Sequence, residues 1–307
     1  MRRISALVVA ASVLAAVTAC SATPAASDCA SPVSSGPAST TVDAAGDFGT
    51  APTVTFPRPL ITSTIEKSTI IEGDGEVLHD GQPVVLEATI LSAVDGTELQ
   101  KTAYAAEGGS LFTVGDDSLP ALGSALECAA VGSRIAVVAA ASANAEGAET
   151  GGDAIVYVVD VLRAYPARAD GVDQLPVPGM PSVVSAPDGT PGLTIPSESA
   201  PTDYRQSVLQ LGSGDTIAAE DLVVAKVTAV DWETRMVSQS TWATGGTSIV
   251  DLAGTTVSEG LKQAITGERI GSRVLAVVPG SLGVTADGAT PSDATIVYVV
   301  DILGTVK

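Results

Sequence analysis

Hydrophobic and polar residues follow the same pattern twice along the chain. Two octapeptides, Ile155–Leu162 and Ile296–Leu303, read IVYVVDVL and IVYVVDIL and differ at one position. Runs of β-branched residues around one Tyr are typical of buried strands. Other segments repeat at an offset of 139, such as Val131–Arg134 (VGSR) and Ile270–Arg273 (IGSR). The chain is therefore expected to contain two copies of one unit, each closed by the Tyr-bearing strand.

Within each unit the pattern predicts mostly strands and one short helix. Residues 257–267 carry apolar side chains at helical spacing, and Ser258 and Gly267 are suited to cap the two ends. Residues 119–128 are the weaker counterpart in the first unit. Apolar runs predict strands at 68–72, 84–94, 110–114 and 133–139, and again at 207–211, 222–231, 248–252 and 272–278. The expected class is α+β, with one antiparallel sheet folded over one short helix in each unit.

The remaining segments suggest how the chain is divided. Residues 1–19 have the pattern of a lipoprotein signal peptide, because two Arg precede a short apolar run and small residues stand directly before Cys20. Lipidation of Cys20 follows from this interpretation, and an ordinary secretory signal is the alternative. Residues 20–51 are expected to form a disordered tether, and the Pro- and Gly-rich residues 165–190 an extended linker. The two units then span 52–164 and 191–307.

Charge and composition narrow the functional classes. The formal net charge of −20 repels nucleic acid, so nucleic-acid binding is not expected. Membrane attachment must then come from the lipid on Cys20, which places the protein on the outer face of the cytoplasmic membrane. His79 is the only His, and no Cys/His cluster has metal-ligand spacing, so neither metal nor cofactor is expected. Cys29 and Cys128 either form a disulfide, which an exterior compartment favours, or remain free thiols.

The order of elements resembles the FKBP-type peptidyl-prolyl cis-trans isomerases, in particular secreted actinobacterial lipoproteins with two such domains. Residues 227–242, 257–273 and 294–303 carry the resemblance. The last of these, ATIVYVVDIL, is similar to the family's final strand, A-T-L-V-F-D-V-E-L. The resemblance implies two tandem FKBP-like domains. It also implies an extracytoplasmic isomerase that acts on proline-containing polypeptides without a cofactor.

The pocket positions that the resemblance implies depart strongly from the family's pattern. The pocket Asp is replaced by Gln239 in the second unit and by Gln100 in the first. Leu261 and Leu122 stand where the family has the Trp of the pocket floor. The final-strand aromatic persists, and it is Tyr298 in the second unit and Tyr157 in the first. The other positions carried over are Val227, Ser238, Val257 and Val284 in the second unit and Leu99 in the first.

These departures leave three functions open. Isomerisation needs a dry, shaped apolar cradle for a twisted amide rather than a proton relay, so the lack of a catalytic triad does not argue against an enzyme. The favoured interpretation is a slow isomerase and folding helper with a better preserved second unit. The alternatives are a non-catalytic module that binds polypeptide or a surface partner, and a spacer of two β-rich domains. For Tyr157 and Tyr298 a core role competes with pocket lining, and for Gln100 and Gln239 a solvated loop amide is the alternative.

Overall fold

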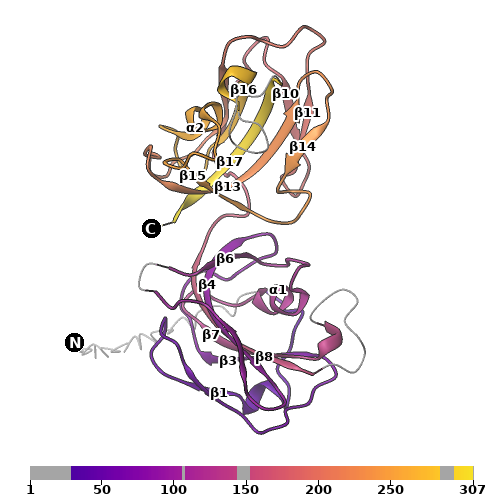
Figure 1. Ribbon diagram of the computed structural model, residues 1–307, viewed down its shortest axis with the longest axis vertical. Coiled ribbons are helices and arrows are strands. Elements are labelled where there is room, and N and C mark those ends of the chain that lie inside the picture. Colours follow the sequence, from indigo (N-terminus) through magenta and orange to yellow (C-terminus); the bar gives the residue numbers. More distant parts are fainter. Residues whose placement is uncertain (1–28, 106–107, 144–152, 284–293, 307) are drawn as a thin grey trace, which may run out of the picture.

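The computed structural model describes residues 29–105, 108–143, 153–283 and 294–306. The predicted signal peptide, Cys20 and Val284 lie outside these ranges. Two β-rich units are stacked along the long axis of the molecule, and the chain passes from one to the other through a single connection (Figure 1). Among the described residues, no helix is long and apolar enough to cross a membrane.

The first unit is built on a six-stranded antiparallel sheet. Its strands are β3 (Ile65–Ile71), β4 (Pro83–Ser92), β5 (Glu98–Lys101), β6 (Ser110–Thr113), β7 (Arg134–Ala139) and β8 (Ile155–Ala164). They lie in the order β3-β7-β8-β4-β5, and β6 pairs with the start of β4 while β5 pairs with its end. The long strands β4, β7 and β8 therefore form the centre of the sheet.

The second unit repeats this arrangement. Its strands are β9 (Val172–Asp173), β12 (Arg205–Leu211), β13 (Leu222–Asp231), β14 (Val237–Ser240), β15 (Ser248–Asp251), β16 (Arg273–Val278) and β17 (Ile296–Val306). Their order is β14-β13-β17-β16-β12-β9, and β15 pairs with β13. The register also repeats, because Tyr157 stands opposite Ile90 and Val137 whereas Tyr298 stands opposite Ala229 and Ala276. Equivalent residues of the two units can therefore be compared one by one.

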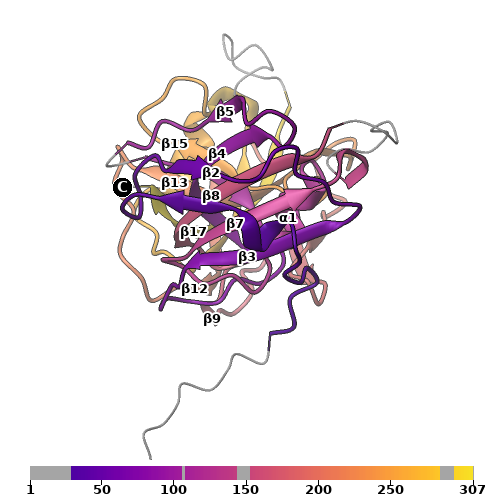
Figure 2. The ribbon, with the colours of Figure 1, turned by 90° about the horizontal axis from the view of Figure 1, so that it is seen from below.

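Each unit also carries a two-stranded hairpin over one face of its sheet. In the first unit it is formed by β1 (Asp43–Ala45) and β2 (Thr53–Thr55), and in the second by β10 (Ser182–Ser185) and β11 (Pro191–Thr194). Seen along the long axis, β2 lies close to β8 (Figure 2), and Val54 packs on the core to which Val156 and Val158 of β8 belong.

These hairpins overturn two predictions. Residues 29–51 were expected to be part of a disordered tether, yet Ala38, Val42 and Ala44 are buried against the sheet. Residues 165–190 were expected to form an extended linker, yet they include β9, β10 and the buried Tyr165. Residues 29–51 are poor in large apolar residues, and residues 165–190 are rich in Pro and Gly. The order of both segments comes from contacts with a sheet far away in the sequence rather than from their own composition.

A disulfide ties the start of the described chain to the first unit. Cys29 and Cys128 are bonded, with their Cα atoms 5.6 Å apart and 99 residues of separation in the sequence. Lys67 strengthens the same junction, because its Nζ donates to Ser31 Oγ at 2.8 Å and to the Glu127 carbonyl oxygen at 2.9 Å. The start of the segment that precedes β1 is thus held to the first unit by a covalent bond and by Lys67.

The helices are close to the predicted positions but slightly shorter. They are α1 (Pro120–Leu126) and α2 (Glu259–Ile265), and the short 3₁₀ helices are η1 (Ser39–Thr41), η2 (Ala141–Ala143) and η3 (Gly280–Leu282). Ser258 caps α2 as predicted, since its side chain accepts a hydrogen bond from the Leu261 N–H at 3.2 Å. Gly260 lets α2 lie close to β16, because a Cβ at that position would fall 2.1 Å from Val278 Cγ1.

Both faces of each sheet are buried. The face that carries the helix forms one core, which contains Leu78, Leu126 and Ile135 in the first unit and Ala264, Ile265 and Val300 in the second. The face under the hairpin forms another core, which contains Val138 and Val158 in the first unit and Trp232 and Val299 in the second. We call these two sides the helix face and the hairpin face.

A buried ion pair on each hairpin face explains the Asp in each octapeptide. Arg134 Nε donates to Asp160 Oδ1 at 2.6 Å, and Arg273 Nε donates to Asp301 Oδ1 at 2.5 Å. Each guanidinium also donates to the backbone of its hairpin, for example to the Gly46 carbonyl oxygen at 2.8 Å and to the Gly189 carbonyl oxygen at 2.9 Å. The charged pair therefore anchors the hairpin to the sheet.

The two units meet through the same end of each sheet. Val85 of β4 and the equivalent Val224 of β13 belong to one apolar cluster with Tyr165 and Leu303. Lys226 Nζ donates across the junction to the Gly81 carbonyl oxygen at 3.2 Å.

Candidate functional site

Two predicted pocket positions of the second unit, Tyr298 and Gln239, lie at the ends of one row that crosses three strands on the helix face. Tyr298 of β17 stands opposite Ala229 of β13, and Ala229 stands opposite Gln239 of β14. Directly opposed residues of adjacent antiparallel strands share a face and lie about 5 Å apart. The row therefore leads from the aromatic ring at the sheet centre to the amide at the sheet edge, with a small side chain between them.

The start of α2 supplies the apolar side chains next to this row. Val257 and Leu261 are half-buried and pack against the same core as Tyr298. Leu282 of η3 packs against that core as well and is also half-buried. These side chains and Tyr298 form a partly open apolar surface on the helix face, which we call the Tyr298 surface, and the buried Ala229 stands beside Tyr298 in the row.

The hydroxyl of Tyr298 connects the sheet to the helix. It forms a hydrogen bond with the side chain of Ser258, the residue that caps α2. Burial raises the pKa of Tyr298 above its usual value, and the hydrogen bond with Ser258 opposes part of that rise. Tyr298 is therefore neutral at physiological pH. It orients the helix start and presents its ring rather than a charge.

The other predicted positions of the second unit lie apart from this surface or at its edge. Val227 is a fully enclosed core residue. Ser238 and Gln239 are exposed on β14 and line a hollow of about 530 Å³ between β14 and the loop that leads to β15. Gln239 thus belongs both to the cross-strand row and to the rim of this hollow, which gives it a hydrogen-bonding amide at the edge of the apolar surface.

The equivalent surface of the first unit is closed. Tyr157 and Leu122 are each only 3% exposed and belong to the core. Ile90 stands where the second unit has Ala229, and its larger side chain packs against the same core. Leu99 and Gln100 of β5 are exposed at the sheet edge. Filling of the row by Ile90 explains why Tyr157 is buried while Tyr298 remains half-buried.

The arrangement can bind an apolar segment, and its chemistry is simple. Tyr298, Ala229, Val257, Leu261 and Leu282 carry no charge, and the nearest polar group of the row is an amide. Within the described ranges, no three His, Cys, Asp or Glu side chains come together in a group that could hold a metal ion. A surface of this kind stabilises a bound group through desolvation and shape rather than through proton transfer.

Sequence reasoning missed Ala229, Leu282 and the connection between Ser258 and Tyr298. The sequence did contain a signal for Ala229. When the two units are aligned at an offset of 139, the first unit has Ile90 at the position where the second unit has Ala229. Neither Leu282 nor the Ser258 hydrogen bond has a comparable signal, since both depend on how η3 and α2 fold back onto the sheet.

Comparison with known proteins gives structural matches alone. No protein-family model and no curated protein matches the chain. The structure of the three FKBP domains of wheat FKBP73 matches with 20% identity over 79% of this chain and 95% of that chain, at a TM-score of 0.33. FkpA from Escherichia coli matches with 18% identity over 40% of this chain and 51% of that chain, at a TM-score of 0.30. The N-terminal domain of FKBP42 from Arabidopsis thaliana matches with 16% identity over 37% of this chain and 96% of that chain, at a TM-score of 0.31.

Proposed function

We propose that the chain is an FKBP-type polypeptide-binding protein that holds proline-containing segments on the Tyr298 surface and isomerises their X-Pro bonds slowly. One observation carries the proposal: Tyr298 is half-buried beside the small Ala229, whereas its counterpart Tyr157 is enclosed beside Ile90. Only the second unit therefore keeps an accessible aromatic and apolar surface at this place in the fold.

The physical demand of the reaction fits such a surface. An X-Pro bond isomerises over tens of seconds behind the barrier of amide resonance. Apolar contacts that favour a twisted, partly desolvated amide lower this barrier without a nucleophile or a base. Leu261 provides less flat contact area than a Trp would, and Gln239 has no charge, so the predicted acceleration is small.

An isomerisation assay on a proline peptide tests this proposal directly. The unmodified protein is expected to exceed the uncatalysed rate, and Ala229→Ile is expected to return the rate to background because it copies the filled row of the first unit. Ile90→Val, a mild change in the first unit, serves as the matched control and should leave the rate unchanged. Full activity in Ala229→Ile would show that the Tyr298 surface is not the site.

A second candidate function is polypeptide binding without catalysis. The observation in its favour is that the chain has Leu261 and Gln239 where the family it resembles has a Trp and an Asp. Titration of the same peptide, followed by NMR, separates the two functions. Shifts at Tyr298 and Leu261 that disappear in Ala229→Ile, without any rate acceleration, would assign the surface to binding alone.

We further propose that residues 1–19 are removed and that Cys20 is lipidated, which holds the protein on the outer face of the cytoplasmic membrane. The disulfide at Cys29 gives this proposal a geometric consequence. Eight residues separate Cys20 from Cys29, so the first unit would lie no more than about 30 Å from the lipid attachment. Cys20→Ser should release the protein from membranes, and retention of that variant in the membrane fraction would contradict the lipid anchor.

A further inference from the structure

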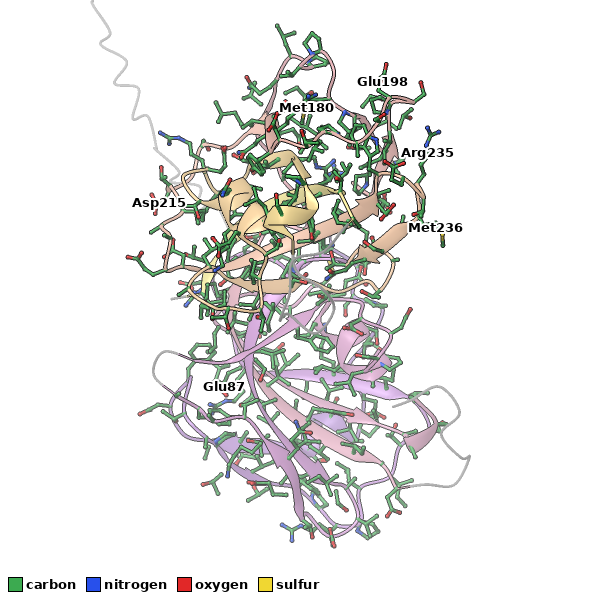
Figure 3. All side chains as sticks on the ribbon, turned by 45° about the horizontal axis from the view of Figure 1, so that its top comes forward. Glu87, Met180, Glu198, Asp215, Arg235 and Met236 are labelled. Carbon is green, nitrogen blue, oxygen red and sulfur yellow. A yellow bond between two sulfur atoms is a disulfide. The ribbon has the colours of Figure 1, made fainter. Side chains whose placement is uncertain are left out.

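The second unit contains a cavity on its hairpin face, on the other side of the sheet from the Tyr298 surface. The cavity has a volume of about 410 Å³ and lies between β12, β16 and the segment that leads into β10. Leu209, Leu275, Val183 and Met180 give it apolar walls, and Ser207 places a hydroxyl among them. Polar side chains complete the lining, and they include Asp173, Gln174, Gln210 and Arg273. In Figure 3, Met180 lies at the end of the second unit that faces away from the first unit. Glu87 marks the first unit in the same view.

The equivalent place in the first unit is filled by the chain itself. Ser68 and Ala136 stand opposite each other there, as Ser207 and Leu275 do in the second unit. The 3₁₀ turn η1 and the residue before it pack onto this point, with Ala38 4% exposed and Ser39 fully enclosed. Ser68 Oγ donates a hydrogen bond to the Ser39 carbonyl oxygen at 2.7 Å. A short turn with small side chains therefore fits this position of the fold.

Two interactions hold that turn in the first unit. The Glu66 carboxylate accepts hydrogen bonds from the N–H groups of Ala38 and Ser39, at 2.7 and 3.0 Å. The hydroxyl of Ser39 also exchanges hydrogen bonds with the backbone of Gly36, at 3.2 Å in each direction. The turn thus needs an acceptor on β3, a Ser at its centre and a small residue at its start.

The second unit has lost all three of these features. Arg205, which has no acceptor, replaces Glu66, while Pro178 and Leu175 replace Ser39 and Gly36. Residues 172–179 consequently remain exposed, and Leu175 reaches 89% exposure. The chain's own segment cannot form the turn that fills the first unit, because Pro178 provides neither the N–H nor the hydroxyl that the turn requires.

What remains around the cavity is suited to a partner segment. Ser207 is largely buried, and no hydrogen bond among the described residues engages its Oγ, so it offers a free donor. Val172, Leu175 and Val184 are exposed large apolar residues on the strands and the segment beside the cavity. Exposed apolar side chains gathered around a concave site indicate an interaction surface rather than a solvated one.

We propose that this cavity binds a short turn of another polypeptide chain that carries small side chains such as Gly, Pro, Ala and Ser. The turn occupies the place that residues 36–42 occupy in the first unit. Its backbone carbonyl accepts a hydrogen bond from Ser207, and its small side chains rest on Leu209 and Val183, which are both partly exposed. The site is independent of the Tyr298 surface because the sheet separates the two.

The test is an NMR titration of the ¹⁵N-labelled protein with the peptide Gly-Pro-Ala-Ser-Thr-Thr-Val, which has the sequence of residues 36–42. With peptide up to about 10 mM, amide shifts are expected at Ser207, Leu209 and Leu275. Ser207→Ala should weaken binding about two- to tenfold, the range for loss of one hydrogen bond. Ser68→Ala, the matched change in the first unit, should leave the affinity unchanged.

Three results would overturn the proposal. The first is an absence of shifts at the highest peptide concentration. The second is an equally strong response to the peptide Leu-Pro-Val-Pro-Gly-Met-Pro, which has the sequence of residues 175–181 and cannot form the turn. The third is a shift pattern on the helix face that Ala229→Ile abolishes, because the peptide would then bind to the Tyr298 surface. Unchanged binding in Ala229→Ile supports a separate site, whatever the isomerisation assay shows.

Discussion

Asp301→Asn is expected to destabilise the second unit by about 3 to 5 kcal/mol. Asp301 is 1% exposed and holds Arg273 through two hydrogen bonds, at 2.5 and 2.7 Å. Its Oδ2 also accepts from the Ala169 N–H at 2.9 Å. Asn has nearly the same volume, so the substitution removes the charge without creating a cavity, and the Arg273 guanidinium is left buried without its counter-ion.

The size of the effect can be read from a urea titration. For a unit of this size an m-value of about 2 kcal/mol/M is reasonable, so the midpoint should fall by about 2 M. Tryptophan fluorescence isolates the second unit, because the chain's two Trp residues, Trp232 and Trp242, both belong to it. Trp242 is also a close reporter, with the Arg273 guanidinium 6.0 Å from its ring centroid.

Asp160→Asn provides the matched control, since it breaks the equivalent pair of the first unit, which has no Trp. It should lower the urea midpoint of the transition that circular dichroism detects, and it should leave the midpoint of the second unit's fluorescence transition nearly unchanged. A fall of less than about 0.5 M in the midpoint of Asp301→Asn would refute the reasoning, because the buried charge would then contribute little to stability.

Three other predictions concern stability. Arg235→Gly should stabilise the second unit by about 0.5 to 1 kcal/mol in the same urea assay, because Arg235 has a φ of 58° where the first unit has Gly96; a loss of stability would contradict this. Burial lowers the pKa of Lys67 from 10.5 to about 8 in the folded protein, an effect that Glu127 partly opposes. Between these two pH values the unfolded chain binds more protons than the folded chain, so the free energy of unfolding should rise from about pH 8 to pH 10. Urea midpoints measured at each pH should show this rise in the native protein and a smaller rise in Lys67→Met. Cys128→Ser removes the disulfide between residues that are 99 positions apart, and it should lower the free energy of unfolding of the first unit by about 4 kcal/mol. The midpoint temperature of its thermal transition should fall; an unchanged midpoint would mean that the other contacts of residues 29–51 hold this segment.

Much of each unit could be predicted from local patterns. The β-branched runs of β4, β7 and β8 and their repeats in the second unit are buried on both faces, so their composition alone marks them as strands. The helical spacing and the Ser258 cap identified α2, because both signals lie within a few residues of one another. The short edge strands β5 and β14 were not predicted, since their exposed residues carry no apolar pattern.

The candidate site was predictable in part. Tyr298, Val257 and Leu261 were chosen from the family resemblance, and the structure places all three as half-buried side chains against one core. Val227 lies in the interior of that core, because its strand turns that side chain toward α2. Whether the surface is open depends on Ala229 and Ile90, and the effect of that exchange is visible only once the strand register is known.

Hydrophobic periods and caps within short stretches predict the repeat, the central strands and the helix of each unit. The other features depend on contacts between segments that are distant in the sequence. Residues 46–50 are held because Arg134 donates to the carbonyl oxygens of Gly46, Asp47 and Thr50, none of which is near Arg134 in the sequence. The same applies to the cavity of the second unit, which exists because Arg205 and Pro178, far apart in the chain, cannot hold the turn that Glu66 and Ser39 hold in the first unit. Contacts between distant segments carry no local pattern, so they are settled only when the sheet brings those segments together.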